Sequence, residues 1–150
     1  MRYAFLITIL SLLFITCKKD STDSAPVITY ESISPNSIHS SITNNNQQFP
    51  ILTIHIKDAD GDLGLISGKD TSFIFIKNIL TGSQDSLQFP DLSGSAKNFE
   101  GDVIIPLPSS VLTSDGAPTD TLYFQVYVKD FARQTSDTII TQDPVYFYTP

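Results

Sequence analysis

The sequence predicts an all-β domain, a sandwich of two sheets, behind a short N-terminal export segment. Two observations predict this fold class: apolar and polar residues alternate in several short runs, and turn-forming residues separate those runs. A third is that no stretch of the chain has the spacing of an amphipathic helix. A chain of 150 residues, 41% of them hydrophobic, is long enough for one domain with a substantial core.

Seven strands are expected after Pro26. Leu52, Ile54 and Ile56 occupy alternate positions, which is the period of a strand with one buried face. The run 73–76 is apolar at every position, so we expect it to be buried on both faces. The expected strands cover residues 27–33, 50–57, 72–80, 86–90, 101–107, 120–130 and 138–148. The residues expected to face the core from central strands are Ile54, Ile76, Phe124 and Val126. Seven short strands at this spacing predict an immunoglobulin-like, Greek-key sandwich.

Residues 1–16 have the features of a signal peptide. One positive charge precedes 13 mostly apolar residues, Tyr3–Ile15, which is shorter than the roughly 20 residues of a membrane-spanning helix. The only cysteine, Cys17, follows at once. The segment Phe14–Cys17 resembles a lipobox, which implies that the Cys17 thiol receives diacylglycerol and that the chain is cut before it. The alternative is an ordinary signal peptide cleaved within Ser21–Ala25.

Three segments are therefore expected: a lipoprotein signal peptide (1–16), a lipidated cysteine with a polar tether (17–26), and the sandwich domain (27–150). The lipid anchor would hold the protein on a membrane of the bacterial cell envelope, the outer membrane, facing either the periplasm or the outside. A net charge of −7 argues against nucleic acid as a partner, because phosphate backbones would be repelled. With one cysteine the domain has no internal disulfide, so packing, with or without a bound ion, must stabilise it.

An acidic loop follows the second expected strand. Asp58, Asp60 and Asp62 alternate with small residues and are followed by Gly64. Several carboxylate oxygens close together are the ligands that Ca²⁺ prefers. In a seven-strand sandwich the second and sixth strands end on the same side, which would bring Asp130 beside Asp58. The sequence thus predicts a Ca²⁺ site made by these four aspartates. The alternative is an acidic hairpin whose aspartates bond nearby backbone N–H groups.

Signals of catalysis are few. The chain lacks the serine, zinc, thiol and phosphate-binding motifs that mark common enzyme classes. His39, in a polar loop, and His55, on the outer face of a strand, are expected to be surface residues without a catalytic partner. We therefore predict a protein that is not an enzyme. A small hydrolase that uses two carboxylates stays a distant alternative, because aspartates are plentiful.

Four segments carry a resemblance to a known family. They are Ile33-Ser34-Pro35, the loop Asp58-Ala59-Asp60-Gly61-Asp62-Leu63-Gly64, the strand from Gly101 to Leu107, and Tyr127-Val128-Lys129-Asp130. In these segments the chain after Pro26 resembles an uncharacterised family of Bacteroidetes-type lipoproteins. The resemblance implies an immunoglobulin-like fold and a place in the cell envelope, and it implies no activity. Here Phe131-Ala132-Arg133-Gln134 stands where an Ala-Gly-Asn-like turn is more usual.

These observations lead to one expected function and two alternatives. We expect a non-catalytic envelope module that binds a partner protein or a glycan, or serves as a scaffold. The main alternative is a purely structural spacer or accessory subunit that Ca²⁺ stabilises, and the hydrolase is the third.

Overall fold

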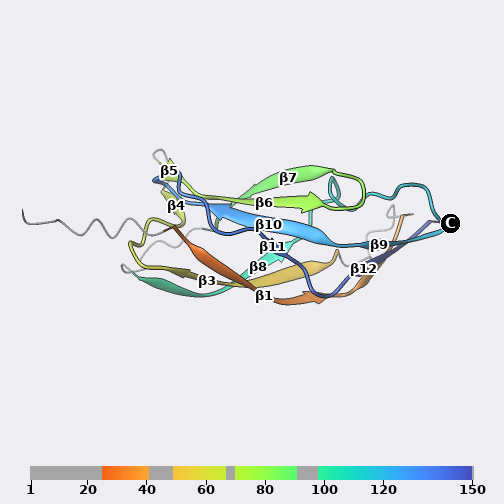
Figure 1. Cartoon of the computed structure of the whole chain (residues 1–150), viewed down its shortest axis with the longest axis horizontal. Coiled ribbons are helices and arrows are strands. Elements are labelled where there is room, and N and C mark those ends of the chain that lie inside the picture. Colours follow the sequence, from red (N-terminus) through yellow and green to blue (C-terminus); the bar gives the residue numbers. More distant parts are fainter. Residues whose placement is uncertain (1–24, 41–48, 67–69, 91–97, 150) are drawn as a thin grey trace, which may run out of the picture.

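The computed structural model describes residues 25–40, 49–66, 70–90 and 98–149. Within these ranges every regular element is a β-strand, and the two largest sheets lie one over the other (Figure 1). The prediction of an all-β fold is confirmed at this level. No helix in the described ranges is long and apolar enough to cross a membrane.

The first sheet has the order β1-β3-β8 and is antiparallel throughout. Its strands are β1 (Val27–Ser34), β3 (Ile51–Asp58) and β8 (Phe99–Pro106). In the central strand β3, every second side chain is buried, so Leu52, Ile54 and Ile56 contribute one face to the core. Val27 pairs with Lys57, which places the start of β1 beside the end of β3.

The second sheet has the order β11-β10-β6-β7 and is also antiparallel. Its strands are β6 (Phe73–Asn78), β7 (Gln84–Gln88), β10 (Phe124–Lys129) and β11 (Ile139–Ile140). Ile76 pairs with Val126 across β6 and β10, and both face the first sheet.

Two smaller sheets lie at opposite ends of the molecule (Figure 1). One has the order β2-β12-β9, with β2 (Ser37–His39) parallel to β12 (Val145–Tyr148) and β9 (Thr119–Leu122) antiparallel to it. The other pairs β4 (Leu65–Ile66) with β5 (Asp70–Thr71).

The core lies between the two large sheets. Ile54, Phe124 and Val126 are 0% exposed and Ile76 is 1% exposed, so the four predicted core positions are confirmed. The prediction that 73–76 is buried on both faces is wrong, because Phe73 and Phe75 are only partly buried. They lie on the outward face of the second sheet, opposite the face that carries Ile76.

The strand boundaries differ from the predicted seven strands for a physical reason. The expected strand 120–130 is divided at Tyr123, because β9 pairs with β12 whereas β10 pairs with β6. The expected strand 138–148 is divided in the same way: β11 pairs with β10, and β12 pairs with β2 and β9. Each long run thus passes from one sheet to another, and in the first run the hydrophobic alternation continues across the break, from Leu122 to Phe124. The short strands β2, β4 and β5 were not predicted, and His39 belongs to β2 instead of a loop.

Candidate functional site

The acidic loop begins where β3 ends. Asp58 is the last residue of β3, and Asp60 and Asp62 follow it in an irregular segment. Gly61 has a φ of 72° and Gly64 a φ of 126°. These values lie in the left-handed region, which residues with a Cβ rarely adopt, so glycine is needed where the loop reverses.

A second loop meets it from the other sheet. Asp130 directly follows β10. The Phe131 amide donates to the carbonyl oxygen of Asp62 at 3.1 Å, and the Ala132 amide donates to Asp62 Oδ2 at 3.1 Å. The segments that follow β3 and β10 therefore meet, although the carboxylates close enough to share one ion are Asp58, Asp60 and Asp62, without Asp130.

Backbone amides fix the orientation of three of the carboxylates. Asp58 Oδ2 accepts the Asp62 amide at 3.0 Å, and Asp62 Oδ2 accepts the Ala132 amide. Asp130 Oδ1 accepts the Gln134 amide at 2.7 Å. Each of these side chains thus gives one oxygen to a backbone amide, within its own loop for Asp58 and Asp130 and across the two loops for Asp62.

The remaining oxygens are buried. Asp58 is 1% exposed and Asp130 is 3% exposed. Asp58 Oδ1 and Asp62 Oδ1 are inaccessible to solvent and accept no hydrogen bond. The same holds for one oxygen of Asp60 and one of Asp130, although both of these side chains have other contacts. A buried acceptor without a partner costs about 1–3 kcal/mol, and more if charged, so a cation bound at these oxygens would remove that cost.

The electrostatics agree with this conclusion. Burial, followed by the contact with Asp60 and the charge of Asp62, raises the pKa of Asp58 from 3.8 to about 7. Burial also raises the pKa of Asp62 to about 6, with the charges of Asp130 and Asp60 adding to the effect and the bond from Ala132 opposing it. The folded protein therefore resists charging these carboxylates at neutral pH when nothing positive lies between them.

The spacing of the oxygens fits a single cation. Asp58, Asp60 and Asp62 each offer an oxygen, and these oxygens all lie within 4.8 Å of one another. Ca²⁺ binds oxygens at about 2.3–2.6 Å, so two ligands on opposite sides of it are separated by about twice that distance. The cluster contains only carboxylates, and hard cations such as Ca²⁺ and Mg²⁺ prefer oxygen ligands to the imidazole and thiolate groups that favour transition metals.

Two supporting residues were missed by sequence reasoning. The Ser72 hydroxyl, fully buried, donates to the Asp62 carbonyl and accepts the Gly64 amide, each at 3.3 Å. Gln134 positions the Asp130 carboxylate through its backbone amide. Neither has a sequence signal, because Ser72 was expected to be the first residue of a strand and any residue except proline offers an amide.

His55 also differs from its prediction. It lies on the outward face of β3 as expected, but its Nδ1 is 2.7 Å from Asp102 Oδ1 on β8. Lys57 forms an ion pair at 3.2 Å with Glu100, which lies directly opposite it on β8. These are exposed cross-strand charge pairs, which typically contribute little to stability.

The remaining predicted site residue, Cys17, lies outside the described residues, as does the whole of 1–16. Comparison with protein-family models, with curated proteins and with solved structures found no match to this chain. Function must therefore be argued from the chain's own residues.

Proposed function

We propose that this protein is a non-catalytic, Ca²⁺-binding module of an exported lipoprotein. The observation that carries the Ca²⁺ assignment is Asp58 Oδ1: it belongs to a side chain that is 1% exposed, accepts no hydrogen bond, and lies in a three-carboxylate cluster. Asp62 Oδ1 has the same lack of a hydrogen bond. A divalent cation bound there would satisfy both oxygens and remove the repulsion between the carboxylates.

The proposed role of the ion is structural. Asp58, Asp60 and Asp62 come from the end of β3 and the loop that follows it. This loop accepts the amides of Phe131 and Ala132, in the turn after β10 of the other sheet. An ion that fixes the loop would therefore support the contact between the two sheets at one end of the domain. Extracellular Ca²⁺ modules commonly bind in the range of about 10⁻⁴–10⁻³ M, which suits an exported protein.

We further propose that the sandwich is immunoglobulin-like. The strand orders β1-β3-β8 and β11-β10-β6-β7 support this. In both sheets, strands that are distant in sequence are neighbours, as the Greek-key connections between the two facing antiparallel sheets of that fold require. The parallel pairing of β2 with β12 adds support, because it links the first part of the chain to the last strand. Placement in the envelope is proposed on the apolar run Tyr3–Ile15 and on Cys17, which would carry the lipid.

Titration calorimetry and thermal unfolding in Ca²⁺ test the proposed site. For a dissociation constant of 10⁻⁴–10⁻³ M, 10 mM Ca²⁺ stabilises the native state by about 1.4–2.7 kcal/mol. The melting temperature should then rise by several degrees, and EDTA should reverse the rise. Asp60→Asn with Asp62→Asn should abolish the response, whereas Asp137→Asn, an exposed aspartate elsewhere, should keep it. No heat of binding and no thermal response at 10 mM Ca²⁺ would leave the loop as an acidic hairpin.

A further inference from the structure

We propose that the outward face of the β6–β10 sheet binds an acidic oligosaccharide, through an aromatic pair surrounded by unpaired cations. The inference goes beyond the proposed Ca²⁺ site and supplies a ligand class for the binding module that the sequence leads us to expect. Of the four aspartates only Asp130 lines one of the hollows, and the variants below leave all four in place, so the Ca²⁺ response of the same samples separates a failure here from a failure of the cation site.

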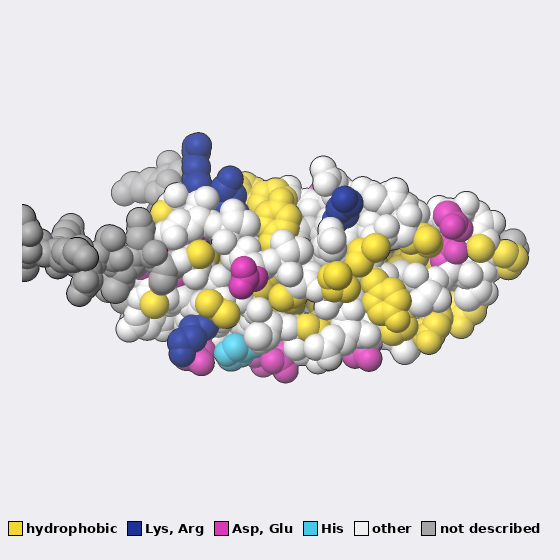
Figure 2. Space-filling model, in the orientation of Figure 1, with side chains coloured by type: hydrophobic (Ala, Val, Ile, Leu, Met, Phe, Trp, Pro, Cys, Tyr) yellow, Lys and Arg dark blue, Asp and Glu magenta, His cyan; other side chains and the backbone are white. Residues whose placement is uncertain are grey.

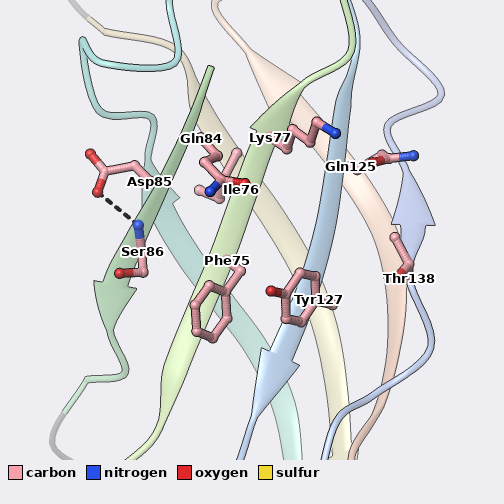
Figure 3. Close-up of a pocket in the computed structure, with 9 residues that line it drawn as sticks. All are labelled: Phe75, Ile76, Lys77, Gln84, Asp85, Ser86, Gln125, Tyr127 and Thr138. Atoms are coloured by element: carbon pink, nitrogen blue, oxygen red, sulfur yellow. Dashed lines mark hydrogen bonds between the residues drawn. The ribbon is translucent and has the colours of Figure 1, made fainter. Parts of the chain in front are cut away.

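The centre of this face is an aromatic pair. Phe75 on β6 and Tyr127 on β10 are direct cross-strand partners, with ring centroids 4.7 Å apart and ring planes within 8° of parallel. Both rings are only partly buried, and Figure 3 shows them side by side on the sheet. Such rings offer the apolar surface on which the C–H groups of a sugar ring pack, with little side-chain entropy to lose.

Polar side chains surround the rings. By register, Ser86 lies beside Phe75, and Gln125, Lys77 and Gln84 form the next row of the same face (Figure 3). With Thr138 they line a hollow of about 380 Å³. This volume is near the lower end of the range of about 300–1,000 Å³ for small-ligand sites, and a few polar groups around an apolar floor are typical of such sites.

A second hollow, of about 490 Å³, continues from the first, and Phe75 lines both. It is lined further by Phe73, Phe131, Lys129 and Arg133. The two hollows together extend along the sheet face, so the surface offers room for more than one sugar unit.

The charge of this face is opposite to that of the protein. Three cationic residues, Lys77, Lys129 and Arg133, line the hollows although the chain carries a net charge of −7. Within the described ranges none of the three makes an ion pair, whereas Lys57 on the first sheet is paired with Glu100. Figure 2 shows Lys and Arg side chains on both sides of an apolar patch over this sheet.

The carboxylates that line the hollows have partners already. Asp85 accepts the hydroxyl of Ser110 and the amide of Ser86, and Asp130 accepts the amide of Gln134. Both carboxylates keep their negative charge, but three cations against two carboxylates leave the lining of the hollows with an excess of positive charge, which favours a ligand that carries carboxylate or sulfate groups.

A saccharide fits these features better than an acidic peptide does. The hollows lie on the face of the sheet, where the backbone groups of β6 are already paired with β7 and β10. An extended peptide takes much of its affinity from backbone hydrogen bonds at a sheet edge, and it would find few here. A sugar needs side-chain amides, hydroxyls and an aromatic surface, and all three are present.

The test measures binding of defined tetrasaccharides to the purified full-length chain by calorimetry. The probes are hyaluronan (carboxylate), chondroitin sulfate (carboxylate and sulfate) and chitotetraose (neutral). At least one acidic probe should bind at least tenfold more tightly than chitotetraose, and its affinity should fall with added salt. If hyaluronan binds as tightly as chondroitin sulfate, carboxylate groups alone are sufficient for binding.

Variants locate the binding. Tyr127→Ala, and separately Lys129→Gln with Arg133→Gln, should each weaken binding of the acidic probe at least tenfold. The double variant Lys129→Gln with Arg133→Gln, which removes two surface charges, keeps the test valid if Tyr127→Ala fails to fold. Lys57→Gln and Tyr146→Ala, matched changes at exposed positions on other sheets, should alter it less than twofold. A hexaglutamate peptide serves as a further, non-saccharide probe. The proposal is overturned if no acidic saccharide binds at 10 mM, or if chitotetraose or the peptide binds as tightly as the acidic saccharides. It is also overturned if the control variants lose as much affinity as the variants at the hollows.

Discussion

Without Ca²⁺, the stability of the protein should fall as pH rises from 4 to 8. Asp58 has a folded-state pKa of about 7 against an ordinary value of 3.8. A raised carboxyl pKa means that the folded state prefers the protonated form. The stability that protonation supports is fully present below pH 4, where the unfolded chain is also protonated, and is lost as pH rises through the folded pKa.

The size of the effect follows from the shift. Each unit of pKa difference corresponds to 1.36 kcal/mol, so a shift from 3.8 to about 7 corresponds to about 4 kcal/mol between pH 4 and pH 8. Asp62, with a pKa of about 6, acts in the same direction, but the two groups share one repulsion and their contributions are not added. With saturating Ca²⁺ the charged form is favoured, so the loss should shrink or reverse.

Urea unfolding at several pH values, in EDTA and in 10 mM Ca²⁺, measures both curves. Asp58→Asn keeps an oxygen for the Asp62 amide and removes the buried charge, so in EDTA at pH 8 it should be more stable than the wild type. In Ca²⁺ the order should reverse. Asp137→Asn is the matched exposed control and should follow the wild type. A flat or rising stability between pH 4 and pH 8 in EDTA would refute the reasoning, as would a destabilised Asp58→Asn under the same conditions.

Three further predictions concern other parts of the chain. Cys17→Ala should abolish labelling by a fatty-acid probe and release the protein from membranes, and a labelled variant would contradict lipidation. Phe124→Ala, at a position that is 0% exposed, should lower the free energy of unfolding by about 3–5 kcal/mol in denaturant titrations, whereas a loss below about 1 kcal/mol would mean that its side chain does not fill the core. Arg133→Gly should stabilise the domain by about 1 kcal/mol, because Arg133 has a φ of 67° and this left-handed conformation costs about that much for a residue other than glycine. An unchanged stability would count against strain at this turn.

The part of the fold that the sequence could predict is the part set by side-chain alternation. Residues such as Ile54 and Phe124 lie at alternate apolar positions, and a one-residue slip would expose the whole set. The division of 120–130 at Tyr123 could not be predicted, because it reflects a change of pairing partner and leaves the alternation intact. The partial exposure of Phe75 was missed for a related reason: an apolar run does not reveal whether its second face is covered.

The candidate site was predictable in its residues and only partly in its geometry. The alternate aspartates of the loop are a local pattern, and the strand order brings Asp130 to them. What the sequence could not supply is which oxygen of each carboxylate a backbone amide would take. That detail supports the proposed cation site over an acidic hairpin, since Asp58 Oδ1 accepts no hydrogen bond. The pairing of His55 with Asp102 was missed because it depends on the register between β3 and β8.

The position of the proposed ion suggests why it would matter in a domain without an internal disulfide. The bonds from Phe131 and Ala132 to Asp62 hold the loop after β3 to the turn after β10, and together with the bonds of Ser72 to Asp62 and Gly64 they link the sheets at this end. The first strand starts at the same end, because Val27 pairs with Lys57, and the proposed lipid tether would pull there. The turn also carries Phe131 and Arg133 into the second hollow. An ion at Asp58, Asp60 and Asp62 would therefore stabilise the end that bears the proposed anchor and support one wall of the proposed binding surface at the same time.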